Sequence, residues 1–295
     1  MSPTLTILTP AYNRSHTLPR LYHSLIKQTD SNFEWIVVDD GSVDDTRPLL
    51  FKYIEEKKIK LSYLYQTNAG KHIALNTGIK NIDTEITIIV DSDDYLTSDA
   101  VETIKKQWSL VRENNLCGIS FLKGYDVEKS IGQKFENNNF IGNGIEIRYN
   151  QGISGDKAEV WKTSILKKFP FPKFEGENFL SEGIVWKRIY KQYDMLFINQ
   201  IIYIAEYLPG GLTGTGRLLL IKNPQGAMLN AKLAMTKEFN ISVRDKNALL
   251  YIAYSFFAKK SIREMIKYGG ETLLITLNIP FGWAIYLFWK KKYKL

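Results

Sequence analysis

Short apolar runs alternate with amphipathic stretches over the first hundred residues of the chain. The runs are rich in Ile, Val, Leu, Trp and Tyr, which predicts strands buried on both faces. Between them, apolar side chains recur every three or four residues, which predicts amphipathic helices. The predicted strands are residues 5–10, 33–42, 60–66 and 85–91, and the predicted helices are 16–29, 44–59, 70–81 and 99–114.

Strands that alternate with helices predict an α/β fold, a mostly parallel sheet flanked by helices on both faces. Ligands of such sheets gather beyond the carboxyl ends of the strands. Three polar motifs follow predicted strands: TPAYN at 9–13, DDGS at 39–42 and DSDD at 91–94. We therefore expect the functional site at this edge. The helix after DSDD is predicted to begin after Ser98 as its N-cap.

The pattern is less regular from residue 117 onward. It predicts a strand at 117–126, an Asn- and Gly-rich mobile loop at 136–144, a strand running into a helix at 158–166, and helices at 182–194 and 247–269, the last as one helix or a pair. We predict a catalytic domain over 1–215, with nucleotide-sugar binding in 1–100 and the acceptor and catalytic part in 101–215. Residues 216–295 are predicted to form a helical extension.

Charge separates this extension from the rest of the chain. The formal charge is +8, but Lys and Arg number 14 against 4 Asp and Glu from Gly216 onward, and 25 against 27 before it. A nucleic-acid surface over the whole protein is therefore not expected, whereas the tail should be attracted to an anionic partner. The single cysteine, Cys117, fits a reducing cytoplasm.

An apolar run in the extension suggests what that partner is. Residues 273–289 are interrupted by Asn278, Pro280 and Gly282, and the run is short for a membrane span. Trp and Tyr near its end, followed by lysines, favour a segment that lies at an anionic membrane surface. The alternative is a core helix packed on the catalytic body.

The motifs supply candidate chemistry. Asp91 and Asp93 lie on the same side of a strand end, where they could share Mg²⁺ or Mn²⁺, ions that usually also hold a diphosphate. Asp40 could accept hydrogen bonds from a base N–H, or it could serve only a turn. Lys71 could meet a phosphate or a base, or it could be a solvated lysine at a helix start.

Four motifs, TILTPAYNR, FEWIVVDDGSVDDT, NAGKHIALNTGI and VDSDD, occur in this order. Together they resemble family 2 glycosyltransferases, inverting enzymes of the GT-A fold that use nucleotide-activated sugars. The resemblance implies that Asp93 ligates the metal that bridges the donor diphosphate. It also implies a set of residues that contact the nucleotide sugar: Thr9, Ala11, Tyr12, Asp40, Lys71, Asp91, Ser92 and Arg217.

The chain departs from the family at one position. Many members carry Arg-Asn-x-Gly where this chain has ALNTG, with Leu75 in place of the arginine. Lys71, His72 or Arg14 could take over the phosphate contact. The glycine-rich loop 206–217 could close over the donor, with Arg217 reaching a phosphate, or it could be a plain surface loop.

An inverting transfer needs a base that takes the proton of the acceptor hydroxyl. The family's Glu-Asp-x-x-Leu-x-x-Arg pattern fits in two registers. Glu182 matches the spacing to Val185 and Arg188, whereas Glu177 precedes Asn178, an amide that cannot act as a base. We prefer Glu182, whose alternative role is to cap the following helix. Asp156 and Arg188 are predicted on the acceptor side.

The sequence therefore predicts a metal-dependent inverting glycosyltransferase on the cytoplasmic face of the membrane. It would move a sugar from a nucleoside diphosphate, UDP by family habit, to a glycan or lipid-linked acceptor of a bacterial surface polysaccharide. One alternative is a catalytically inactive subunit that binds nucleotide sugars or acts as a membrane scaffold, which Asn178 would favour. A phosphotransferase with an Asp-x-Asp nucleophile leaves TPAYN and DDGS unexplained.

Overall fold

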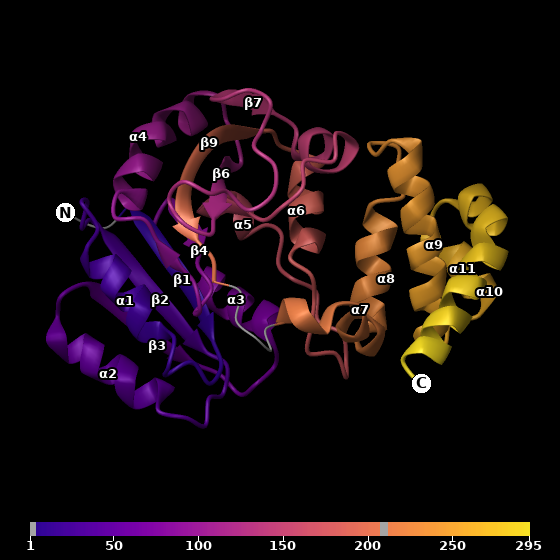
Figure 1. Ribbon diagram of the computed structural model, residues 1–295, viewed down its shortest axis with the longest axis horizontal. Coiled ribbons are helices and arrows are strands. Elements are labelled where there is room, and N and C mark those ends of the chain that lie inside the picture. The colour runs from indigo at the N-terminus through magenta and orange to yellow at the C-terminus, as the bar shows by residue number, and fades with distance from the viewer. Residues whose placement is uncertain (1–3, 207–211) are drawn as a thin grey trace.

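The computed structural model describes residues 4–206 and 212–295, in which helices cover one mixed sheet (Figure 1). The strands are hydrogen-bonded in the order β3-β2-β1-β4-β8-β6-β9-β5, and β7 pairs with β9. Their bounds are β1 Leu5–Ala11, β2 Phe33–Asp39, β3 Lys60–Tyr65, β4 Ile86–Ile89, β5 Tyr95–Leu96, β6 Gly118–Gly124, β7 Phe140–Gly142, β8 Lys157–Lys162 and β9 Met195–Ile204.

The N-terminal half of the sheet is parallel, as predicted. Strand β1 pairs in parallel with β2 and with β4, and β2 pairs in parallel with β3. Every residue of β1 and β2 is buried, as expected for strands covered on both faces. The buried polar residues include Thr6, whose hydroxyl donates to Glu34 Oε1 (2.9 Å). The second half is mixed, because β8 runs antiparallel between β4 and β6. The predicted α/β fold is confirmed.

Helices cover both faces. On one face, α1 (Leu18–Ile26), α2 (Thr46–Glu56) and α4 (Ala100–Glu113) contribute Tyr22, Leu50 and Trp108 to one core. On the other, α3 (Lys71–Lys80) and α6 (Gly183–Tyr190) enclose a second core. The division follows the alternation of side chains along each strand.

Two local predictions need correction. Helix α4 has Asp99 at its N-cap, not Ser98, because the Asp99 carbonyl accepts the first helical bond from Thr103 N (2.9 Å) while the Ser98 carbonyl accepts from Thr29 N. The segment 136–144, predicted as a loop, contributes β7, which pairs with β9. The strand-to-helix prediction at 158–166 is confirmed by β8 and α5 (Thr163–Leu166). A short π-helix, η1 (Glu146–Asn150), precedes them.

The predicted helical extension is present. It consists of α7 (Leu212–Lys222), α8 (Pro224–Leu233), α9 (Ile241–Phe257), α10 (Ile262–Gly269) and α11 (Thr272–Lys292). Figure 1 shows α9, α10 and α11 grouped at the end of the molecule away from β1, β2 and β3. Helix α8 contacts both α6 and α9 and so connects this group to the sheet. The predicted domain boundary at residue 215 falls within α7.

Helix α11 runs without a break through the predicted interruption at Asn278, Pro280 and Gly282. One of its faces packs on α9, where a Cβ at Gly282 would lie 2.6 Å from Ile252 Cβ, so only glycine allows this close approach. Asn278 Nδ2 donates to Asp245 Oδ1 on the same face (2.8 Å). The opposite face exposes apolar side chains: Leu273, Leu277, Phe281, Trp283 and Phe288.

Candidate active site

The loops that follow β1 and β2 are tied together at the carboxyl edge of the sheet. Asn13 N donates to Ser42 Oγ (2.8 Å), and Val43 N donates back to Asn13 Oδ1 (2.8 Å). The Asp44 carboxylate accepts from Ser15 N and Ser15 Oγ in the first loop. Motifs far apart in sequence thus form one rigid rim, as their strand-end positions predict.

Asp40 fixes the turn that starts α3. Its Oδ1 accepts from Ala69 N (2.9 Å) and Gln66 Nε2 (2.7 Å), and its Oδ2 accepts from Gly70 N (2.8 Å). Gly70 has φ 94°, and a Cβ there would lie 2.1 Å from the Asn178 carbonyl oxygen. A glycine is therefore required where the turn approaches the segment leading into α6.

This approach brings Lys71 between two carboxylates. Lys71 Nζ lies 2.6 Å from Asp91 Oδ1 after β4 and 2.8 Å from Glu182 Oε1 at the start of α6. Burial opposes the charged form of Lys71, but the charges of Asp91 and Glu182 outweigh it and raise the pKa of Lys71. Burial likewise opposes ionisation of Asp91, but the charges of Lys71 and Lys123 lower its pKa. Lys71 therefore links the predicted donor side to the predicted base.

Glu182 occupies the N-cap position of α6 without making a side-chain cap bond. Its carboxylate is directed to Lys71 instead, so the capping alternative does not account for it. Glu177 has a different environment. Its Oε1 accepts from Gln225 N (2.6 Å) and its Oε2 from Gly226 N (2.8 Å), both in the first turn of α8. Both Glu177 oxygens are thus engaged by a helix N-terminus, which favours negative charge.

The other two aspartates of DSDD differ from each other. The Asp93 carboxylate accepts no hydrogen bond from the described residues and lies 3.9 Å from Arg14 Nη2. Asp94 is buried, accepts from Tyr203 Oη (2.7 Å) and Glu206 N (3.0 Å), and so holds β9 against the motif. Burial and the charge of Asp91 raise the pKa of Asp94 to about 7. Asp93 is the carboxylate left available to a ligand.

Asp91 and Asp93 suit a divalent cation in one common arrangement. Among the described residues, no group of three His, Cys, Asp or Glu side chains is placed to hold a metal ion. Mg²⁺, however, is usually held by one or two carboxylates together with substrate phosphates and water. The Asp93 carboxylate accepts no hydrogen bond within the described ranges and follows Asp91 by two residues, so the pair fits that oxygen-rich coordination.

The remaining predicted site residues differ in their burial and in their contacts. Thr9 is fully buried and accepts from Trp35 Nε1 (3.0 Å), Ala11 and Ser92 are buried, and Tyr12 is half exposed. Asp156 is exposed just before β8. Arg188 donates to the Pro170 carbonyl (2.9 Å).

Arg217 is turned away from the aspartates. Its guanidinium donates to Tyr254 Oη (2.5 Å) and lies 4.6 Å from the centroid of the Trp289 ring, between α9 and α11. Of the glycine-rich loop 206–217, residues 207–211 lie outside the described residues. Of the three predicted substitutes for the missing arginine, Lys71 contacts Asp91 and Arg14 contacts Asp93. The third, His72, is buried, and burial lowers its pKa, which disfavours a positive charge there.

Sequence reasoning missed two residues beside the site. Lys123 in β6 lies with Nζ 4.0 Å from the Tyr203 ring centroid, and its charge lowers the pKa of Asp91. Glu159 in β8 is only partly exposed, and burial raises its pKa to about 7. A lone Lys or Glu in a strand resembles an ordinary surface position. The one available signal was that each is a charged residue in the middle of a predicted apolar strand.

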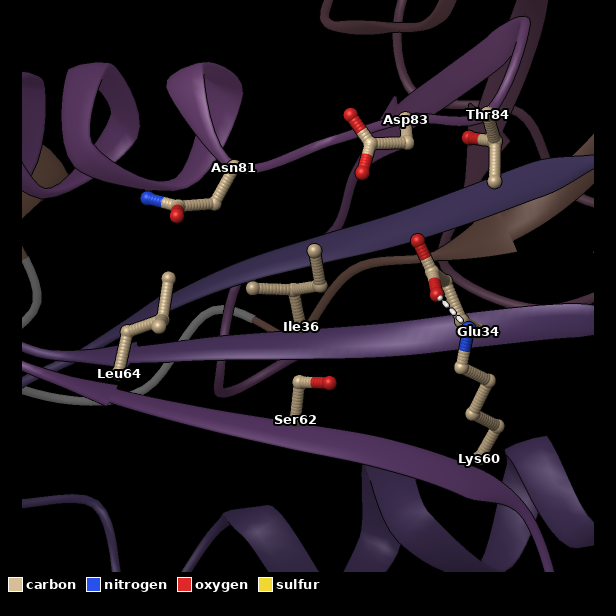
Figure 2. Close-up of a pocket in the computed structure, with 8 residues that line it drawn as sticks. All are labelled: Glu34, Ile36, Lys60, Ser62, Leu64, Asn81, Asp83 and Thr84. Atoms are coloured by element: carbon tan, nitrogen blue, oxygen red, sulfur yellow. Dashed lines mark ion pairs between the residues drawn. The ribbon is translucent and has the colours of Figure 1, made fainter.

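A cavity of about 480 Å³ lies elsewhere, beside β2 and β3 on the face that α3 covers (Figure 2). Figure 2 shows Glu34 facing Lys60 near the amino ends of these strands, with a 2.6 Å ion pair between them. Because parallel strands carry their carboxyl ends together, this cavity is at the opposite end of the sheet from Asp91.

Residues 6–158 match the sequence model of "Glycosyl transferase family 2". The chain is 30% identical over 212 residues to the UDP-Glc:alpha-D-GlcNAc-diphosphoundecaprenol beta-1,3-glucosyltransferase WfgD of Escherichia coli, which is 69% of this chain and 76% of that protein. Several curated relatives are much longer, and the chain spans between 15% and 19% of their length.

Two solved structures share the fold. TarS of Staphylococcus aureus in complex with UDP-GlcNAc superposes with a TM-score of 0.66 at 19% identity, over 96% of this chain and 80% of that one. The mannosyltransferase PcManGT of Pyrobaculum calidifontis, in complex with GDP-Man and Mn²⁺, has a TM-score of 0.60 at 16% identity, over 99% and 88%. The sequence match over half the chain, together with the GT-A fold, places this protein in glycosyl transferase family 2.

Proposed function

We propose that this protein is an inverting glycosyltransferase that moves a sugar from UDP to a hydroxyl of a lipid-linked glycan during bacterial surface polysaccharide synthesis. The observation that carries the proposal is Lys71, which bridges Asp91 of the strand-end motif and Glu182 at the start of α6. The names of the E. coli and S. aureus relatives support a UDP-sugar donor, and that of the E. coli relative supports a diphospholipid acceptor.

The donor would lie along the carboxyl edge of β1, β2 and β4. Tyr12 and Asp40 belong to the rim that would enclose the nucleoside, and Thr9 and Ala11 form the end of β1 that leads into it. Asp91 and Ser92 would lie near the first phosphate. Asp93 would hold Mn²⁺ or Mg²⁺, which when bound would stabilise the negative charge that develops on the departing diphosphate. Arg14 and Lys71 would supply further positive charge there.

Glu182 would act as the base. As the acceptor oxygen attacks the anomeric carbon, its proton passes to the Glu182 carboxylate, and the bond from the anomeric carbon to the diphosphate breaks. Lys71 holds this carboxylate in place, with its Nζ 2.8 Å from Glu182 Oε1. Asp156 and Arg188 would lie toward the acceptor.

The acceptor's lipid would place the enzyme on the inner face of the cell membrane. In the part of the chain that the structure describes, α11 is the one helix long and apolar enough to cross a bilayer, and 17% of its most apolar window is buried. Its packed face, with Asn278 bonded to Asp245, argues for a helix lying in the interface rather than one surrounded by lipid. Residues 216–295 would then be a membrane-docking unit beside the catalytic part.

Glu182→Gln tests the proposal. The amide keeps the shape but cannot take a proton, so we expect transfer to fall by at least about a thousandfold. UDP-glucose or UDP-GlcNAc with Mn²⁺ should still raise the melting temperature of the variant. Unchanged transfer would eliminate Glu182 as the base. Wild-type protein that binds the donor without transferring sugar would favour the inactive subunit, for which Asn178 is the argument.

A further inference from the structure

The sheet face beneath α6 carries polar groups that have no hydrogen-bond partner among the described residues. Ser120 of β6 lies directly opposite Glu159 of β8 in the antiparallel register, so both side chains are on the same face. That face is the one under α3 and α6, because the flanking residues Leu122 and Trp161 belong to their core. Ser120 is 1% exposed, and its Oγ has no hydrogen-bond partner among the described residues.

Arg148 reaches the same place from the π-helix η1. Its Nη2 donates to the Gly155 carbonyl (2.8 Å), whereas its Nη1 is buried and unpaired within the described part of the chain. Its positive charge acts on Glu159, which itself makes no hydrogen bond or ion pair with any described residue. Single-turn π-helical segments are frequent at functional sites.

These groups adjoin the proposed reaction centre. Trp161, two residues beyond Glu159 on the same face of β8, stacks on Trp186 of α6 with ring centroids 4.4 Å apart. In agreement with this packing, burial and the negative charge of Glu182 both raise the pKa of Glu159. Buried polar atoms in folded proteins nearly always have partners. Among the described residues Ser120 Oγ and Arg148 Nη1 are buried without one, beside the Glu159 carboxylate, which indicates a partner that arrives with the substrate. A hydroxyl, a guanidinium and a carboxyl group together can donate to and accept from neighbouring hydroxyls on a sugar ring.

We propose that Ser120, Arg148 and Glu159 form a subsite that binds the ring hydroxyls of a pyranose, carried by either the nucleotide-sugar donor or the glycan acceptor. The inference rests on the proposed function, because it assigns sugar selectivity to that same site. A sugar that lacks the matching hydroxyl would leave buried polar groups unpaired, which is the strongest known basis for discriminating between related substrates.

Ser120→Ala and Glu159→Gln test the subsite, with Ser255→Ala as the matched control. The Ser120 hydroxyl has no partner to lose in the described part of the chain, so its removal should leave the melting temperature unchanged or higher. We expect both subsite variants to lower kcat/KM by about tenfold or more while binding UDP as the wild type does. Ser255 is also fully buried but donates only to the Tyr251 carbonyl in α9, so its variant should keep wild-type kinetics.

The source of the pyranose is separated by measuring donor hydrolysis without an acceptor. If the donor sugar occupies the subsite, hydrolysis of UDP-glucose or UDP-GlcNAc falls together with transfer. If the acceptor sugar occupies it, hydrolysis stays constant and the KM for a diphosphate-linked GlcNAc acceptor rises. Wild-type kcat/KM in both subsite variants overturns the inference and leaves the proposed function standing. A wild-type protein that binds no sugar nucleotide overturns both.

Discussion

Asp44 shows how one side chain fixes the geometry of the donor edge. Its carboxylate accepts from Ser15 N (3.0 Å), Ser15 Oγ (2.7 Å) and Thr46 N (3.0 Å), so it joins the loop after β1 to the start of α2. Burial alone would raise its pKa, but the hydrogen bonds from Thr46 and Ser15 lower the pKa of Asp44 to about 2. The ionised form is therefore favoured by folding.

Asp44→Asn should lower the free energy of unfolding by about 1–2 kcal/mol at pH 7. Because the folded pKa lies below the unfolded value near 4, the contribution of Asp44 is complete above pH 4 and is lost as the pH falls through about 2. Denaturant titrations between pH 7 and pH 3 should show the gap between variant and wild type narrowing. Asp45→Asn is the control, since Asp45 is exposed and makes no side-chain cap bond. A gap that is constant with pH would contradict this account.

Residue roles could be predicted where a motif coincides with a strand end. Asp91 and Asp93 were found in this way, because position and charge together mark them. The spacing around Glu177 and Glu182 could not show which carboxylate reaches Lys71, since that depends on how α8 docks against the segment before α6. Glu159 and Lys123 escaped prediction because their surroundings arise when β8 and β9 pair with β6, and these three strands are far apart in the chain.

At the scale of elements, the first turn of α8 depends on a side chain from another segment. The buried Glu177 carboxylate accepts two of the backbone N–H groups that a helix leaves unpaired at its start. It also carries negative charge to the positive end of the helix dipole. Helix α8 in turn connects α6 to α9, so Glu177 holds the extension to the catalytic part.

Glu177→Gln should lower the free energy of unfolding by about 1–3 kcal/mol, because one carboxylate acceptor is replaced by an amide donor facing an N–H. Transfer per folded molecule should stay near the wild-type rate. Urea denaturation and turnover measured on the same preparation check both expectations. Loss of transfer with unchanged stability would instead make Glu177 the base and remove that role from Glu182.

Whether an element could be predicted depends on how far apart in sequence its pairing partners lie. The parallel half of the sheet is built from consecutive strands and helices, so local periodicity predicts it correctly. The second half is built from pairings between β6, β8 and β9, which lie up to about eighty residues apart, and no local pattern encodes them. Strand β7 was predicted as a loop because its Asn- and Gly-rich setting conceals three residues that pair only after β9 is in place.

At the scale of the molecule, the last helix of the basic extension, α11, packs one face on the protein and exposes the other. Helix α11 packs on α9 around Gly282 and Asn278, while its other face is apolar and ends in Lys290, Lys291 and Lys292. Lysines beside an exposed apolar face match an anionic membrane surface, since the charges meet lipid headgroups and the apolar side chains enter below them. Removing α11 would uncover Ile252, so substitutions on the free face give the cleaner test.

The triple substitution Leu277→Gln, Phe281→Gln and Phe288→Gln should abolish sedimentation with vesicles that contain anionic lipid. The partition coefficient should fall at least about tenfold, because burial of each large apolar side chain contributes up to ~2 kcal/mol. Activity on a soluble acceptor should be unchanged. Phe51→Gln, Leu110→Gln and Val127→Gln, also exposed but away from α11, form the control. Wild-type binding should weaken with salt, since the lysines act through screened charge. If the triple variant still sediments, the membrane assignment of this face fails. If the substitutions change only the molar mass in light scattering, the face pairs two copies of the chain instead.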